Sequence, residues 1–242
     1  MIGCGCEVCC SSDPHNVRTR SSAWIQAGEV SLLVDSGPDL RFQALREQMR
    51  CLDAVLYTHA HMDHVVGFDE LRAFCWHRDG PLPLHATAEC MDTLKSMFGW
   101  AFADTNTYPG YVKPLPCRID GAFCYGDVQI TPLPVLHAAV ETIGFLFQRP
   151  GGRSLAYLPD VKEIPPATVE LLLGVDILIL DSLRPNPHPT HFSLNEALDA
   201  IAKILPGEAW LTHLGHENDH TNLDASLPTG VRVAWDGLKL RW

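Results

Sequence analysis

The chain has 242 residues and a formal net charge of −11, from 18 basic and 29 acidic side chains. Hydrophobic residues make up 46% of the sequence, which is enough for the core of a large α/β domain and excludes global disorder. The acidic balance argues against extended binding of a nucleic-acid backbone, which needs clustered Lys and Arg. Because the sequence shows no apolar run of about 18 residues and no signal peptide, we expect a cytoplasmic protein without a membrane partner.

Strands and helices are predicted to alternate along the whole chain. Alternating or β-branched apolar runs predict strands at 30–34, 54–57, 128–136, 142–147, 154–158, 176–180, 209–211 and 231–235. Helical patterns predict helices at 39–49, 68–76, 88–98, 166–173 and 194–204. No linker or change in composition interrupts this order, so we predict a single α/β domain that comprises residues 1–242.

Local signals fix several boundaries of these elements. Ser193, with Glu196 three residues later, predicts a capping box at the start of the last helix. Pro150-Gly151-Gly152 predicts a hairpin turn between two strands. Asp236-Gly237 predicts a second hairpin, which joins 231–235 to a terminal strand at 238–242.

Residues that can bind a metal or transfer a proton follow the predicted strands. In layered α/β folds, strand ends at one edge of a sheet converge and carry the chemistry on a rigid scaffold. We therefore expect one functional site that is built from Asp35, His59, His137, Asp160, Asp181 and His213.

The densest group of such residues is Thr58-His59-Ala60-His61-Met62-Asp63-His64. His59 and His61 are two residues apart on an extended segment, so both rings point to one side. Asp63 and His64 follow where the chain turns toward the predicted helix 68–76. Two imidazoles on one face, with an imidazole and a carboxylate on the next, can begin two neighbouring metal sites. These donors suit Zn²⁺, Mn²⁺ or Fe²⁺.

The segment 58–64 resembles the signature of the metallo-β-lactamase superfamily, whose fold is a four-layer αβ/βα sandwich of two mixed β-sheets flanked by helices. The resemblance implies a pair of catalytic metals: His59, His61 and His137 hold one, Asp63, His64 and His213 hold the other, and Asp160 touches both. It also implies that Asp35 is the buried aspartate that supports the histidine motif. Two metals that flank one water present hydroxide as the nucleophile near neutral pH.

The N-terminus carries a cluster of cysteines. Cys4, Cys6 and Cys9 have Cys-x-Cys-x-x-Cys spacing, so three thiolates can occupy three corners of a tetrahedral zinc site. Reduced surface thiols are the alternative. Cys10 adjoins Cys9 and is expected to point away. The single cysteines are expected to be small buried hydrophobes, namely Cys51, Cys75, Cys90, Cys117 and Cys124.

Over nearly its whole length the chain is most similar to the PhnP-like phosphodiesterases. That branch opens with Gly-Cys-x-Cys-x-x-Cys and ends with Thr-His-x-x-His, here Thr212 to His216, which implies that His216 is the fourth ligand of a structural zinc. A further segment, Thr190 to Asn195, matches the branch and implies that His191 is the general acid for the leaving alkoxide. The strand and Gly-Thr-Gly loop that usually precede the cysteines are not found before them here.

The expected function is a phosphodiesterase that acts on a small (cyclic) nucleotide or ribose phosphodiester. It would use two Mn²⁺ or Zn²⁺ ions, one structural Zn²⁺, and His191, Asp63 and Asp160 as catalytic residues. The alternatives are a thioester or ester hydrolase of the same fold, a protein linked to pyrroloquinoline quinone synthesis, and a metal-dependent binding module. Two other functions of this fold are disfavoured. A tRNA-processing nuclease would need a basic arm, and a glyoxalase-type enzyme would need a helical C-terminal domain; the sequence predicts neither feature. The sequence leaves open whether the protein is a monomer or a homodimer.

Overall fold

The structure is a computed structural model that describes residues 1–76 and 78–242. It has two compact units. The first unit consists of Met1–Thr19 and Gln129–Trp242, and the second unit of Arg20–Val128. Each is built on a sheet that combines parallel and antiparallel strand pairs. Among the residues described, no helix combines the length and the apolar character that a membrane span requires.

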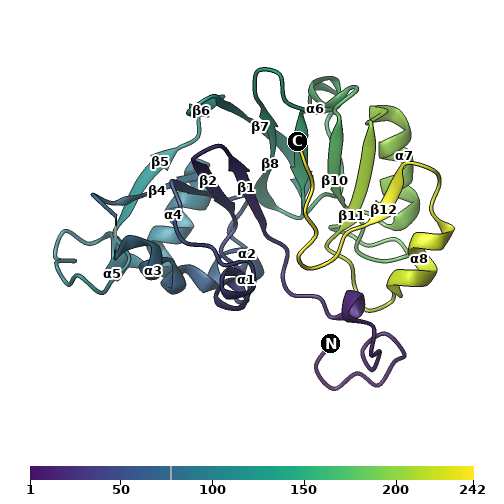
Figure 1. Ribbon diagram of the computed structural model, residues 1–242, viewed down its shortest axis with the longest axis horizontal. Coiled ribbons are helices and arrows are strands. Elements are labelled where there is room, and N and C mark those ends of the chain that lie inside the picture. Colours follow the sequence, from purple (N-terminus) through teal and green to yellow (C-terminus); the bar gives the residue numbers. More distant parts are fainter. Residues whose placement is uncertain (77) are drawn as a thin grey trace. The chain divides into compact units, whose positions relative to one another are not determined.

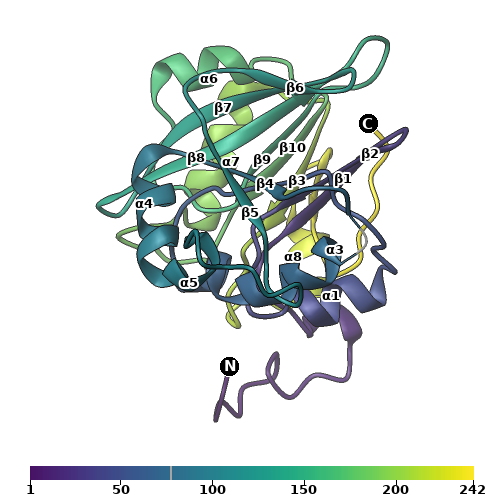
Figure 2. The same ribbon diagram turned by 90° about the vertical axis from the view of Figure 1, so that its left-hand side faces the viewer.

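The sheet of the second unit has the strand order β1-β2-β3-β4-β5. Its strands are β1 (Ala23–Ala27), β2 (Val30–Val34), β3 (Ala54–Leu56), β4 (Leu82–Ala86) and β5 (Pro114–Arg118). The hairpin β1-β2 is antiparallel and the remaining pairs are parallel. The helical segments are α1 (Leu40–Arg46), α2 (Met62–Val65), the 3₁₀ helix η2 (Val66–Leu71), α3 (Arg72–Cys75), α4 (Ala88–Met97) and α5 (Gly99–Phe102). Figure 2 shows α4 and α5 beside this sheet, where Leu94 of α4 packs with Val55 and Leu84.

In the first unit the strands β7 to β12 lie side by side in chain order (Figure 1). They are β7 (Val128–His137), β8 (Val140–Gln148), β9 (Leu155–Leu158), β10 (Ile177–Asp181), β11 (Glu208–Thr212) and β12 (Val231–Val233); β6 (Phe123–Tyr125) precedes β7 in the chain. The pairs from β9 to β12 are parallel, so their carboxyl ends share one edge. The helical segments are η1 (Pro14–Asn16), α6 (Pro166–Leu172), α7 (Leu194–Ile204) and α8 (His220–Ser226). Leu172 of α6 and Ile201 of α7 pack on Leu178 and Leu211 of the sheet.

All eight predicted strands are confirmed within one or two residues at most boundaries, as is the turn between the antiparallel strands β8 and β9. Strands β1, β4, β5 and β6 were not predicted. In β5, Pro114 and Pro116 hid the strand, because proline lacks the N–H that a central strand needs; β5 lies at the sheet edge, where proline is tolerated. The predicted helix 68–76 is instead split into η2 and α3.

The predicted terminal hairpin is wrong. A turn does form at Asp236-Gly237, where Leu238 N donates to Trp235 O at 3.0 Å, but no strand follows it. The tail is held by side chains instead: the guanidinium of Arg149 lies 5.5 Å from the ring of Trp242. The single cysteines also differ from expectation. Cys90 is buried, whereas Cys51 and Cys124 are exposed.

The capping box of α7 is confirmed and supports a prediction about stability. Ser193 N donates to the carboxylate of Glu196 at 2.8 Å, and the Ser193 hydroxyl accepts from Glu196 N at 3.4 Å. Ser193→Ala removes this cap and should lower the free energy of unfolding by about 1 kcal/mol in urea denaturation. Thr93→Ala, inside the exposed face of α4, is the control and should leave stability unchanged or slightly raised. Equal stability of both variants would contradict a contribution from the cap.

Candidate metal centre

The histidine motif begins after β3 and runs into α2, whose N-cap is His61. Its support is Asp35, which directly follows β2 and is fully buried. One carboxylate oxygen of Asp35 accepts from Thr58 N and the other from the Thr58 hydroxyl, each at 2.8 Å. The second oxygen also lies 2.8 Å from His64 Nδ1. Burial raises the pKa of Asp35, and the contacts to His64 and Thr58 oppose that rise.

This arrangement orients the histidine nitrogens of the motif that could bind a metal. Asp35 holds Nδ1 of His64, and a carboxylate that holds one ring nitrogen in this way fixes the orientation of a histidine ring. His59 Nε2 lies 2.9 Å from His61 Nδ1, and the rings of His59 and His64 are 4.3 Å apart. Asp63 adds a carboxylate oxygen 3.9 Å from His64 Nε2. We call these four residues, His59, His61, Asp63 and His64, the motif set.

A second group lies in the first unit at the carboxyl ends of its strands. His137 is the last residue of β7, Asp160 comes two residues after β9, and His213 follows β11 directly. His137 Nε2 lies 3.6 Å from Asp160 Oδ2, and His213 Nε2 lies 3.5 Å from Asp160 Oδ1. His213 has a left-handed backbone, with φ of 56°, a sparsely populated conformation that is typical of functional positions. We call His137, Asp160 and His213 the strand-end set.

His191 adjoins the strand-end set on a loop that is closed at both ends. Leu183 N donates to Phe192 O at 3.0 Å, and Leu194 N donates to Arg184 O at 3.1 Å. The buried His191 ring lies 4.6 Å from the ring of His137 and stacks on that of His213 at 4.8 Å.

Asp181, the last residue of β10, holds this histidine. Its Oδ2 lies 2.8 Å from His191 Nδ1 and also accepts from Val161 N at 2.8 Å. Burial raises the pKa of Asp181 to about 6, although His191 opposes the rise. The sequence placed Asp181 among the strand-end residues expected at the site but gave it no role of its own. Its contact with His191 depends on the closed loop, which no sequence pattern reveals.

The cysteine cluster gathers around a histidine that is more than 200 positions away in the chain. Single donor atoms of Cys4, Cys6, Cys9 and His216 all lie within 4.8 Å of one another, and Cys10 is exposed outside this group. His216 Nδ1 lies 3.5 Å from the sulfur of Cys4 and 3.5 Å from that of Cys6. Tetrahedral zinc with sulfur and nitrogen ligands requires donor separations of about 3.6 Å, so the donors fit that ion. The contact with His216 lowers the pKa of Cys6 to about 6, which favours the thiolate that a metal binds.

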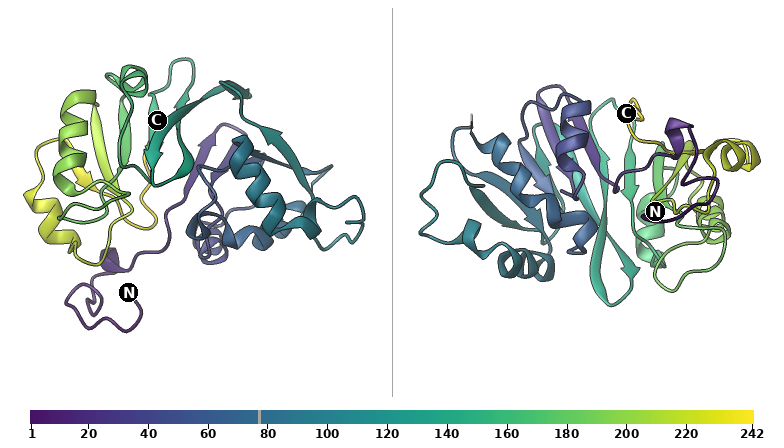
Figure 3. Two further views of the ribbon diagram at one scale, coloured as in Figure 1. Left: turned by 180° about the vertical axis from the view of Figure 1, so that it is seen from behind. Right: turned by 90° about the horizontal axis from the view of Figure 1, so that it is seen from below.

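Both views of Figure 3 show the N-terminal stretch beside the C-terminal segment that contains α8. Arg18 donates to Asn218 O at 2.8 Å, and Asn16 donates to Asp219 at 2.8 Å. The N-terminal segment is therefore tied to the segment after β11 by protein contacts as well as by the cysteine cluster.

A zinc site here predicts a specific loss in one cysteine variant. Cys6→Ser should lower the zinc content by about one ion per chain and lower the melting temperature, since metal binding free energy contributes to folding. Cys10→Ser, which removes a neighbouring exposed thiol, is the matched control and should keep both values. Metal analysis and thermal denaturation of the two variants test this. If Cys6→Ser retains its zinc and its melting temperature, the cysteines are free thiols.

Comparison with known proteins identifies the family. Residues 31–214 match the family described as Beta-lactamase superfamily domain. The chain belongs to the beta-lactamase superfamily. A similar crystal structure in the superfamily is "a New Diphosphatase from the PhnP Family", with a TM-score of 0.91 and 37% identity over 100% of this chain and 91% of that one. Zn²⁺-bound PqqB from Methylobacterium extorquens gives a TM-score of 0.80 at 22% identity, over 100% of this chain and 95% of that one. The predicted metallo-β-lactamase fold, its two mixed sheets and the likeness to the PhnP branch are confirmed.

Curated proteins with similar sequences differ in name and in length. An octanoyltransferase of Porphyromonas gingivalis is 35% identical over 98% of this chain, but this chain spans only 48% of its length. Coenzyme PQQ synthesis protein B of Methylobacterium radiotolerans is 26% identical over 98% of this chain and 93% of its own. About half of the octanoyltransferase lies outside the match, and its name refers to that whole protein.

Proposed function

We propose that the chain is a metal-dependent hydrolase of phosphodiesters, in which the motif set and the strand-end set together hold two divalent ions. The observation that carries this proposal is the donor chemistry shared by the two units. Each unit places buried imidazoles beside a carboxylate, and in each a buried aspartate holds one histidine by its Nδ1: Asp35 holds His64 and Asp181 holds His191. This pattern is typical of catalytic metal sites.

The donors present fit divalent transition metals. As the family resemblance implies, His59, His61 and His137 would hold one ion, Asp63, His64 and His213 the other, with Asp160 touching both. Imidazole and carboxylate donors of this kind suit Zn²⁺ and Mn²⁺. When bound, two such ions supply a hydroxide nucleophile and offset the charge that develops on the phosphoryl oxygens.

His191 is proposed to hold the proton that the leaving alkoxide needs. Its Nδ1 faces Asp181, so the opposite ring nitrogen, Nε2, is the one available to a leaving oxygen. Asp181 fixes the ring and its tautomer rather than touching the substrate. A second role is also compatible with the geometry, because one ring nitrogen of His191 lies within 4.8 Å of the donor atoms of Asp160 and His213. His191 would then be a metal ligand.

The names of the relatives support phosphate-ester hydrolysis as the reaction class. A PhnP-family diphosphatase is 37% identical, and ribonuclease Z of Bradyrhizobium diazoefficiens is 29% identical over 73% of this chain. The chain carries a net charge of −11, which disfavours a long nucleic acid and favours a small (cyclic) nucleotide or ribose phosphodiester.

A role linked to pyrroloquinoline quinone synthesis is the second candidate. It is favoured by the match with Coenzyme PQQ synthesis protein B, which extends over most of both chains. A thioesterase or esterase that uses the same donors is a third possibility that the same assay addresses.

A hydrolysis screen of the metal-loaded protein separates these functions. It compares bis-p-nitrophenyl phosphate, cyclic nucleotides, a thioester and a β-lactam, each with and without a chelator. We expect chelator-sensitive hydrolysis of the phosphodiesters and little turnover of the others. Turnover of the thioester alone, or of none of the four by fully metal-loaded protein, would overturn the proposal.

A further inference from the structure

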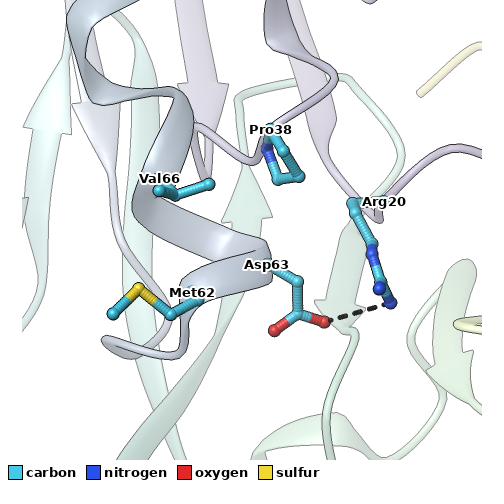
Figure 4. A pocket seen from close by; sticks show the side chains of 5 residues that line it. All are labelled: Arg20, Pro38, Met62, Asp63 and Val66. Atoms are coloured by element: carbon cyan, nitrogen blue, oxygen red, sulfur yellow. Dashed lines mark ion pairs between the residues drawn. The ribbon is translucent and has the colours of Figure 1, made fainter.

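A shallow pocket of about 320 Å³ lies in the second unit, directly beside the motif set. Its residues are Arg20, Pro38, Met62, Asp63 and Val66 (Figure 4). Pro38, Met62 and Val66 form an apolar wall, and Met62 and Val66 are both exposed. Arg20 and Asp63 point toward each other on the polar side. The pocket therefore joins one proposed metal ligand to an apolar surface and one cation.

The backbone of Arg20 is held while its guanidinium remains accessible. Arg20 N donates to Asp39 Oδ2 at 2.8 Å, and Arg20 O accepts from Gln43 Nε2 at 2.8 Å. Both partners belong to the start of α1, so that helix fixes where the side chain begins. The side chain itself is 58% exposed, and one guanidinium nitrogen lies 3.6 Å from Asp63 Oδ2.

Close packing of two glycines maintains the approach of Arg20 to Asp63. A Cβ at Gly37 would collide with the carbonyl oxygen of Asp63 and lie 3.4 Å from the Cβ of Arg20. A Cβ at Gly67 would collide with the carbonyl oxygen of Gly37. Neither position has room for a side chain, because the segment after β2 packs tightly against the backbone of α2 and η2.

The ion pair between Arg20 and Asp63 does not by itself explain why the backbone holds these two residues close together. An exposed pair of this kind stabilises a protein by about 0–1 kcal/mol. A fixed cation beside a metal ligand also opposes metal binding by charge repulsion. The guanidinium has several donors in a planar fork, which matches the oxygens of a phosphoryl or carboxylate group.

We infer that Arg20 recognises a second anionic group of the substrate, while Pro38, Met62 and Val66 contact the carbon skeleton that links this group to the scissile phosphodiester. This inference rests on the proposed function and narrows its substrate class to phosphodiesters whose non-leaving part carries a phosphoryl or carboxylate group. Arg20 is thus a specificity-determining residue at the rim of the site.

Three substrates with one leaving group test the inference. Ethyl, carboxyethyl and phosphonoethyl p-nitrophenyl phosphate release the same p-nitrophenolate and differ only in the charge of the remaining substituent. For the metal-loaded wild type we expect a higher kcat/KM on the two charged substrates than on the ethyl ester. In Arg20→Ala the ratio of charged to ethyl kcat/KM should fall by about 10- to 100-fold, as expected for a lost charged hydrogen bond. The charged substrate that loses more identifies the preferred group.

Two further variants separate recognition from a general effect of charge. Arg20→Lys keeps the charge without the fork and should recover part of the ratio. Arg41→Ala removes an exposed charge of α1 and should leave the ratio and the activity unchanged. An equal loss on all three substrates in Arg20→Ala, with lower metal content, would show that Arg20 only supports Asp63 and would overturn the inference. Failure of the wild type to hydrolyse any of them would instead overturn the proposed function.

Discussion

Asp160→Ala is expected to lower kcat by more than about 10²-fold and to remove at least one metal ion from the protein. This loss in kcat is larger than the roughly 10- to 100-fold loss that is typical when a residue that only supports a metal ligand is replaced. The reason is that Asp160 is proposed to contact both ions. The structure supports this central position: the carboxylate is buried at the carboxyl end of β9, within 3.6 Å of His137 and 3.5 Å of His213. Metal analysis and steady-state kinetics on bis-p-nitrophenyl phosphate measure both effects.

Two controls define what the Asp160 result means. Asp160→Asn keeps the volume but halves the oxygen donors and should also lose metal, whereas Asp199→Ala, on the exposed face of α7, should retain activity and metal. Circular dichroism checks that the buried position still folds. Full metal occupancy with near-normal turnover in Asp160→Ala would remove this residue from the site.

His191→Ala is expected to act selectively on substrates with poor leaving groups. p-Nitrophenolate departs without a proton, so hydrolysis of p-nitrophenyl diesters should fall only slightly. An alkyl or cyclic ribose phosphodiester needs a proton on its leaving oxygen, and its kcat should fall by about 10²–10⁴-fold. Metal content should not change, because Nδ1 of His191 is engaged by Asp181 and the ring is proposed to serve the leaving group.

The variants around His191 distinguish its two possible roles. Asp181→Asn should reproduce a smaller part of the same selective loss, about 10- to 100-fold, because it disturbs only the orientation of the ring. His188→Ala is the matched control: its ring lies 5.2 Å from that of His191 on the same loop, and its loss should affect neither class of substrate. An equal fall on both substrate classes, together with lost metal, would make His191 a ligand and not the acid.

Much of the fold was predictable because each element carries its own local signal. The apolar run 30–34 became β2 with the same bounds, and the Ser193 signal placed the first residue of α7 and both bonds of its capping box. Strand β5 was not predicted because its two prolines indicate the end of a strand. They are tolerated here only because β5 lies at the edge of the sheet. The terminal hairpin failed for a related reason: a turn signal cannot show whether the next segment has a strand to pair with.

The candidate site was predictable to the extent that its residues follow one another in a recognisable spacing. Residues 58–64 form such a motif, and the structure places the buried Asp35 carboxylate 2.8 Å from His64 Nδ1. The approach of Cys6 to His216 was expected from the resemblance, not from the spacing of cysteines alone. The support of His191 by Asp181 and the pocket of Arg20 depend on loops and on glycine packing, which only the folded chain reveals.

The most direct test of the two-metal proposal is a crystal structure of the metal-loaded protein with anomalous scattering at the zinc and manganese edges. The account predicts two ions about 3.5–4 Å apart, ligated by the motif set and the strand-end set and bridged by Asp160, and a third ion at Cys4, Cys6, Cys9 and His216. A single catalytic ion, or two ions held separately without Asp160 between them, would contradict it.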